Sequence, residues 1–176
     1  LKANRYVEIK IEGSDASPFF SEETEASFRK GPAAKEKRFI TFTGEGSKDR
    51  RGLILNLFNG NLSKLPAEMR KVLEESGYGE RFNQYGEICW VIGITGAGAE
   101  GISLKCCRTV HIMEPYWNMS RMLQIMGRAV RFCSHKDLRK GKRHVKIYLY
   151  LATYPGEKTV DQYIWSLAKK KNILIQ

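Results

Sequence analysis

The chain has 176 residues, 42% of them hydrophobic, which is enough to bury the core of one ordinary domain and argues against a disordered class. Its 30 Lys and Arg residues against 19 Asp and Glu residues give a formal net charge of +11, which favours polyanionic ligands such as nucleic acids and nucleotides. We find no membrane-length apolar stretch, no signal-peptide pattern and no CxxC pair, so the sequence predicts a soluble, intracellular protein with reduced thiols. A zinc site using Cys133 and His135 lacks further ligands at workable spacing.

Apolar periodicity predicts strands that alternate with helices along the chain. The predicted strands are residues 5–11, 38–44, 88–94, 109–113 and 145–152. The predicted helical stretches, caps included, are residues 22–29, 47–60, 66–77, 119–132 and 157–172. Residues 12–37 form a surface insertion around the first helix, and residues 134–144 form a basic loop. This alternation indicates an α/β fold, with a mostly parallel sheet between two layers of helices.

The stretch "ITGAGAEGISL" (residues 94–104) has the GxGxxG spacing of a dinucleotide-binding turn at Gly96, Gly98 and Gly101. That motif opens a crossover helix, yet only seven residues separate Gly101 from the next strand at Thr109, fewer than a parallel crossover needs. The spacing therefore argues against an NAD-binding Rossmann domain. Taken alone, the glycines are equally compatible with a tight turn after a buried strand.

A second pattern lies in "RMLQIMGRAVR" (residues 121–131), where Gln124, Arg128 and Arg131 stand at helical offsets of four and three. This spacing places an amide and two guanidinium groups on one face of the predicted helix. A guanidinium keeps its charge and matches phosphate oxygens with a rigid donor fork, so it can stabilise negative charge moving off a γ-phosphate. The alternative is an ordinary pair of solvated surface arginines.

Together these segments resemble a known family. "TGAGAEGISL", "HIMEPYWN" and "QIMGRAVR" resemble, in order and spacing, motifs V, Va and VI of superfamily 2 helicases and of the related Swi2/Snf2 translocases. "TGEGSKDRRGLILNLFN" is similar to the stretch before motif V in the same proteins. The narrower resemblance is to nucleoside triphosphatase I and the early transcription factor ATPase subunit of poxviruses and their relatives, and it runs from Arg38 to Lys171. Arg139 stands where that group is expected to have proline, a difference that affects a loop.

The resemblance implies that residues 1–176 are the second RecA-like lobe, of the P-loop NTPase type, of an ATP-dependent helicase or translocase. The first lobe and the motif IV strand are then expected upstream of residue 1. In such enzymes the first lobe holds the phosphates of ATP and Mg²⁺, and the second lobe supplies arginines when the cleft closes. This sequence has neither GxxxxGK[ST] (Walker A) nor an acidic metal-binding motif, so we expect the isolated domain to be inactive.

By the same resemblance, the candidate site residues divide into four groups. The catalytic group is Arg131 as arginine finger, Arg128 as a second γ-phosphate contact and Gln124 as a positioning residue. The residues facing ATP are Gly98, Glu100 and Gly101. The nucleic-acid contacts are Thr95, Gly44 and Arg51, and the support from motif Va is Glu114, Trp117 and Asn118.

The expected partners are DNA or RNA, the N-terminal lobe and subunits of a transcription machinery, with no membrane. For a viral protein we expect the host cytoplasm, the virus factory and the virion. Trp117 either packs against motif VI or stacks on a base, and the basic loop and Lys169–Lys171 either grip a nucleic-acid backbone or are simply solvated. The alternative function is a non-catalytic, basic nucleic-acid-binding α/β domain, supported by charge alone.

Overall fold

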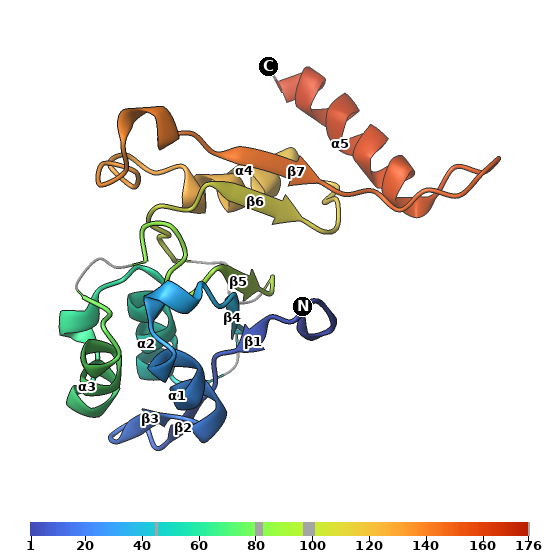
Figure 1. Ribbon diagram of the computed structural model, residues 1–176. Helices are drawn as coiled ribbons and strands as arrows, with labels where there is room; N and C mark the ends of the chain where they lie inside the picture. The colour runs from blue at the N-terminus through green and yellow to red at the C-terminus, as the bar shows by residue number, and fades with distance from the viewer. Residues whose placement is uncertain (45, 80–82, 97–100, 176) are drawn as a thin grey trace. The chain divides into compact units, whose positions relative to one another are not determined.

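The computed structural model describes residues 1–44, 46–79, 83–96 and 101–175, with side chains up to residue 171. It divides the chain into two compact units, Leu1–Cys106 and Cys107–Gln176 (Figure 1). Strands in both units pair in parallel and are joined by helices, so the predicted α/β class is confirmed and agrees with a RecA-like fold. None of the described helices is both long and apolar enough to cross a membrane.

The first unit is built on a three-stranded parallel sheet in the order β1 (Val7–Glu8), β4 (Arg38–Phe42) and β5 (Val91–Ile94). The predicted strand over residues 5–11 is divided in the structure. After β1 the chain leaves the sheet, and β2 (Ile11–Gly13) pairs antiparallel with β3 (Pro18–Phe20). The pattern of alternating side chains did not distinguish one strand from two, because both pieces alternate in the same way.

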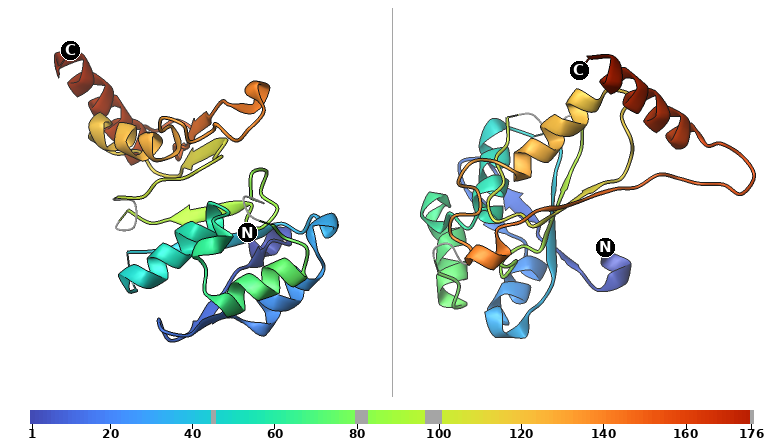
Figure 2. Two further views of the ribbon diagram at one scale, coloured as in Figure 1. Left: turned by 90° about the vertical axis from the view of Figure 1, so that its left-hand side faces the viewer. Right: turned by 90° about the horizontal axis from the view of Figure 1, so that it is seen from above.

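Three α-helices lie on one side of this sheet, as Figure 2 shows: α1 (Glu22–Arg29), α2 (Lys48–Phe58) and α3 (Ala67–Glu75). Ser21 and Ser47 cap α1 and α2, because each hydroxyl oxygen accepts a hydrogen bond from a backbone N–H of the first turn. The predicted cap at Ser47 is thus confirmed. Short 3-10 helices occur at residues 2–4, 32–34 and 62–64.

The core of the first unit lies between the helices and the sheet. It is formed by buried side chains from all three helices and from β4, among them Phe28, Ile40, Phe42, Leu57, Met69 and Leu73. The segment expected to be a surface insertion, residues 12–37, contributes Phe20 and Phe28 to this core, so it is an integral part of the unit. Its many charged residues suggested a surface segment, but the two phenylalanine rings contact each other in a tilted arrangement, with their centroids 5.0 Å apart, and both are buried.

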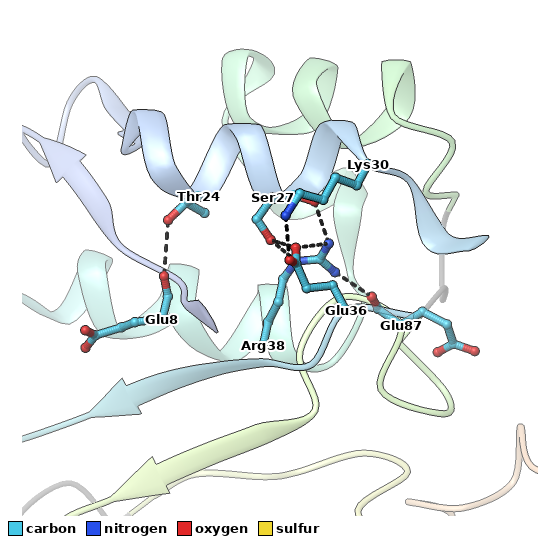
Figure 3. Close-up of polar contacts among 7 residues, drawn as sticks. All are labelled: Glu8, Thr24, Ser27, Lys30, Glu36, Arg38 and Glu87. Atoms are coloured by element: carbon cyan, nitrogen blue, oxygen red, sulfur yellow. Dashed lines mark hydrogen bonds and ion pairs between the residues drawn. The ribbon is translucent and has the colours of Figure 1, made fainter. Parts of the chain in front are cut away.

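One buried arginine joins α1 to the sheet. Arg38, the first residue of β4, is 1% exposed, and Figure 3 shows its guanidinium group directed towards α1. Its Nε donates to Ser27 Oγ at 2.6 Å, its Nη2 to the Ser27 carbonyl oxygen at 2.7 Å and its Nη1 to the Glu87 carbonyl oxygen at 3.1 Å. Glu36 Oε2 lies 3.5 Å from Nη2 and completes the charge pair. The same guanidinium lies over the Phe28 ring, 4.7 Å from its centroid.

The second unit contains a parallel pair of strands, β6 (Thr109–Ile112) and β7 (Lys146–Leu149), and two helices that pack on each other, α4 (Met119–Ala129) and α5 (Val160–Ile175). A 3-10 helix spans Lys140–Lys142 within the predicted basic loop. The start of α5 is set by a capping box. Thr159 Oγ1 accepts from the Gln162 N–H, and Gln162 Oε1 accepts from the Thr159 N–H at 3.0 Å.

The end of α4 differs from the sequence prediction. Periodicity extended the helix to Phe132, but the helix ends at Ala129, and Val130 has φ −102° and ψ 66°. The Ser134 hydroxyl group competes with the helical hydrogen bonds at this point. Its Oγ donates to the Arg131 carbonyl oxygen at 2.8 Å and to the Ala129 carbonyl oxygen at 3.2 Å. Arg131 therefore stands in the turn after the helix, and the argument that it shares a helical face with Gln124 and Arg128 is wrong.

Candidate nucleotide and nucleic-acid site

The predicted nucleic-acid contacts of the first unit gather at the carboxyl ends of two neighbouring strands. Gly44 follows β4 and Thr95 follows β5, and the Thr95 N–H donates to the Phe42 carbonyl oxygen at 3.2 Å. Arg51 lies in the first turn of α2, the helix that follows β4 and is capped by Ser47, and its N–H donates to the Ser47 carbonyl oxygen. In open parallel α/β sheets, ligands bind outside the carboxyl ends of the strands. The fold thus places Gly44 and Thr95 at the same edge of the sheet, because β4 and β5 are parallel neighbours.

Arg51 and its neighbour Arg50 have different surroundings. Arg50 donates to the Glu12 and Gly13 carbonyl oxygens at 3.2 and 2.6 Å and so ties α2 to the β2–β3 hairpin. The side chain of Arg51 has no hydrogen bond or ion pair with any residue that the structure describes. Its charge is therefore available to a ligand, and Thr95 after β5 is exposed.

Only part of the predicted ATP-facing group can be placed. Gly98 and Glu100 lie outside the described residues, while Gly101 is described and has φ +73°, a conformation in which an L side chain is strained. An added Cβ at Gly101 would meet no atom of the described chain within 4 Å, so backbone conformation, not crowding, requires glycine there. The following segment turns inward, with Ile102 and Leu104 buried.

Asn59 holds that segment in place, a role that the sequence did not reveal. Its Nδ2 donates to the Ser103 carbonyl oxygen at 3.0 Å, and its Oδ1 accepts from the Lys105 N–H at 2.8 Å. The side chain therefore bonds the backbone on both sides of Leu104. Asn59 follows α2 immediately, so the signal in the sequence was an amide side chain just after a helix end.

In the second unit, α4 carries the remaining candidates. Asn118 caps the helix, its Oδ1 accepting from the Ser120 N–H at 2.9 Å. Gln124 and Arg128 lie one turn apart on α4, whereas Arg131 follows its last turn. Gln124 and Arg131 are exposed and Arg128 is partly buried.

The guanidinium groups of Arg128 and Arg131 are uncommitted. Neither forms a hydrogen bond or an ion pair with any residue in the described part of the chain. By contrast Arg143 donates to the Leu138 and Lys136 carbonyl oxygens, and Arg121 lies over the Tyr116 ring, 4.5 Å from its centroid. Their donors are therefore available to an anion.

The motif Va candidates lie between β6 and α4. Glu114 is exposed, and the ring of Trp117 is 58% exposed. Lys171 Nζ of α5 lies 4.5 Å from the centroid of that ring, a cation–π contact that partly covers it. Neither of the two expected roles of Trp117 is decided by this contact. It does place one lysine of the Lys169–Lys171 run against motif Va.

The described residues offer no site for a metal ion. Among them, no three His, Cys, Asp or Glu side chains converge as metal ligands would. Cys89 is fully buried, which raises the pKa of its thiol to about 12, and burial also raises the pKa of the Cys107 thiol. Both shifts oppose the thiolate form that binds metals. His135 Nε2 instead donates to the Cys107 carbonyl oxygen at 2.7 Å.

This α/β chain is similar to a set of known proteins. The family described as helicase conserved C-terminal domain matches residues 74–133. "Putative ATP-dependent RNA helicase R563" of Acanthamoeba polyphaga mimivirus is 40% identical over 126 residues, which are 71% of this chain and 21% of that protein. Nucleoside triphosphatase I of Heliothis armigera entomopoxvirus is 36% identical over 99 residues, 56% of this chain and 15% of that protein.

A third relative, "Termination factor NPH-I homolog" of African swine fever virus, is 32% identical over 120 residues, 68% of this chain and 14% of that protein. The chain thus spans about a fifth or less of the length of these relatives. Residues 74–133 match the helicase conserved C-terminal domain family, and the resemblance of the motifs to viral ATP-dependent helicases and poxvirus-type nucleoside triphosphatases is confirmed.

Proposed function

We propose that this chain is the second RecA-like lobe of an ATP-dependent nucleic-acid helicase or translocase. The observation that carries the proposal is the pair of uncommitted guanidinium groups, Arg128 and Arg131, within and beside a segment that matches the helicase C-terminal domain. Relatives named as an RNA helicase and a nucleoside triphosphatase support ATP use by the whole protein.

In this proposal the chain completes an ATP site whose other wall belongs to a first lobe. Arg131 contacts the γ-phosphate as the arginine finger, Arg128 makes a second phosphate contact, and Gln124 positions the nucleotide or the attacking water. Mg²⁺ is assigned to the first lobe, since the described residues of this chain offer no ligand cluster for it. When bound there, the ion neutralises charge on the phosphates.

The strand-end edge of the first unit is proposed to hold the nucleic acid. Thr95 and the backbone at Gly44 contact phosphate groups, and Arg51 adds an uncommitted charge. Gly101, and with it Gly98 and Glu100, is proposed to face ATP. The loop after β5 therefore carries the proposed contacts to both ligands, with Thr95 for the nucleic acid and residues 98–101 for ATP. ATP can move a lobe along a strand only if cleft closure changes contacts to that strand.

A role in viral transcription is the finer part of the proposal. It is supported by the relative named as a termination factor homolog and by the viral sources of all three relatives. The virus factory of an infected cell and the virion are the corresponding locations, with transcription subunits as partners.

The test is the ATPase activity of the full-length protein with no nucleic acid, single-stranded DNA, single-stranded RNA and duplex DNA. We expect nucleic acid to stimulate the ATPase activity, and the nucleic acid that stimulates it most identifies the type of strand on which the protein acts. Arg131→Ala is expected to lower the stimulated rate by about 10³-fold or more, the usual contribution of an arginine finger, and Arg131→Lys to fail to restore it. Arg29→Ala, which removes an exposed ion pair with Glu25 on α1, serves as the control.

Two outcomes contradict the proposal. Full-length protein that binds nucleic acid but never hydrolyses ATP indicates the non-catalytic binding domain. An Arg131→Ala variant that folds normally and keeps more than about a tenth of the wild-type rate removes the finger assignment, given the size of a finger's usual effect.

A further inference from the structure

The residue after Arg131 is the most exposed apolar side chain of the described molecule. Phe132 is 98% exposed, and it takes part in no aromatic or cation–π contact with the described residues. An exposed phenylalanine forgoes the free energy of burying its ring, so the ring is open to a ligand or partner.

The turn that carries Phe132 is firmly held on both sides. Ser134 is buried, its N–H donates to the Arg131 carbonyl oxygen at 3.0 Å, and its Oγ lies 2.8 Å from His135 Nδ1. His135 Nε2 in turn donates to the Cys107 carbonyl oxygen at 2.7 Å. The ring therefore projects from a supported turn and not from a free end.

Backbone conformation indicates that this projection is specified. Cys133 has φ +59°, in the left-handed region that non-glycine residues seldom adopt. Such conformations persist where surrounding contacts enforce them, as the Ser134 and His135 bonds do here. Had the chain continued α4 through this point, as periodicity predicted, Phe132 would have followed the helical track instead.

A ligand that suits both Arg131 and Phe132 has an anionic end and a flat apolar end. Their Cα atoms are ~3.8 Å apart in the chain. Arg131 offers a long side chain with unoccupied donors for phosphate oxygens. Phe132 offers an open aromatic face, on which a nucleobase stacks irrespective of its identity. A nucleotide joins these two groups in one molecule.

We propose that Phe132 stacks on the base of the nucleoside triphosphate whose phosphates Arg131 contacts, which makes it a nucleotide-positioning residue of this lobe. The inference rests on the proposed function and extends it from phosphate to base. Because stacking is tolerant of base identity, the residue strengthens nucleotide binding without selecting adenine. The two guanidinium groups nearby in sequence, Arg128 and Arg131, favour an anionic ligand over a purely apolar protein partner.

The experiment compares full-length wild-type protein with Phe132→Ala and Phe132→Tyr. Each is assayed for kcat and KM with ATP and with ribose 5′-triphosphate, which has the same phosphates but no base. Phe132→Ala is expected to raise KM for ATP about five- to hundredfold, the range of one base–aromatic stack, and to leave KM for ribose 5′-triphosphate and kcat unchanged. Phe132→Tyr keeps a stacking ring and is expected to behave as wild type.

Phe19→Ala, at an exposed phenylalanine of β3, is the matched control and is expected to change none of these values. The proposal is overturned if Phe132→Ala raises both KM values equally, which means a displaced turn, or if it changes neither. It is also overturned if KM for ATP is unchanged while binding of single-stranded nucleic acid weakens, which assigns the ring to the strand. If the wild-type protein has no ATPase activity, the proposed function is overturned as well. If the wild-type protein is active and Phe132→Ala has the same KM for ATP, only the stacking role is overturned.

Discussion

Two arginines show how the two units of the chain use the same side chain differently. In the first unit, Arg38 is buried and each of its guanidinium nitrogens has a partner in Ser27, Glu36 or the Glu87 backbone. In the second unit, Arg131 is exposed and has no partner among the described residues. A buried charge must be paired to be tolerated, so the first arginine is committed to the fold. The second remains available to a ligand from outside the chain.

The largest effect is expected when the committed arginine is removed. Arg38→Ala leaves the partly buried Glu36 with Lys30 as its remaining cation, and it removes the Arg38 donors from the Ser27 and Glu87 carbonyl oxygens. Breaking a buried pair in this way costs about 3–5 kcal/mol. We expect the backbone amides of β4 and β5 to exchange hydrogen much faster in the full-length variant, because the sheet opens more often.

The matched variant for that experiment is Arg128→Ala in α4. Its guanidinium has no partner in the described chain, so its removal is expected to change stability by less than about 0.5 kcal/mol. Similar exchange rates in the two variants would remove the distinction between a structural and an available arginine.

The sequence was sufficient to predict most of the helices and strands, but it did not show which arginine is buried in the fold and which is available to a ligand. Local signals are short-range, so the Glu22–Arg29 helix and the Ser47 cap follow from the residues themselves. Arg38, however, is buried only because α1 and the Glu87 turn fold over the first residue of β4. A charged residue at a predicted strand start gives no sign of such long-range contacts, and the same holds for the burial of Phe20.

The candidate site was predictable in its residue types and less so in its geometry. Gly44 and Thr95 lie at one edge because parallel strands end on the same side, which the alternation of elements implies. The turn after α4 was not predictable from periodicity, since the apolar pattern continues to Phe132 while Ser134 ends the helix. Asn59 was missed because its partners at Ser103 and Lys105 are distant in sequence.

A smaller loss of stability is expected when Asn59 is replaced. Asn59 is uncharged, but like Arg38 its side chain has hydrogen-bond partners within the fold. Asn59→Ala removes two hydrogen bonds that hold residues 103–105, one of them at the exposed Lys105 N–H where water can substitute. We expect a local cost of about 1 kcal/mol, seen as roughly fivefold faster hydrogen exchange at the Lys105 amide.

Asn56→Ala is the control for that measurement. Asn56 lies in the same helix, α2, and among the described residues its side chain has one weak bond, accepted by its amide oxygen from Asn61 at 3.4 Å. Its substitution is expected to leave exchange at Lys105 unchanged. If both variants accelerate exchange equally, the effect comes from a loosened α2 and not from the lost bonds of Asn59.

The smallest effect concerns the partner of Arg38, and it depends on pH. Burial opposes ionisation of Glu36, but hydrogen bonds from Lys30 and Ser27 and the charges of Lys30 and Arg38 outweigh it and lower the pKa of the carboxyl group below its ordinary 4.5. A carboxyl group with a lowered pKa in the folded state stabilises that state above the unfolded pKa. This contribution is lost as pH falls from 4.5 through the lowered value.

Glu36→Gln should therefore open the first unit more often than wild type at neutral pH, and the difference should vanish in acid, where Glu36 is protonated in both states. The buried Cys89 thiol reports the opening, through labelling by a dipyridyl disulfide that reacts in acid and mass spectrometry of the Cys89 peptide. Because both proteins share every other titrating group, their ratio of labelling rates isolates Glu36. A ratio that stays constant from neutral to acid pH would show that the carboxylate serves Arg38 only as a hydrogen-bond acceptor, which glutamine also provides, and that its charge contributes nothing to the fold.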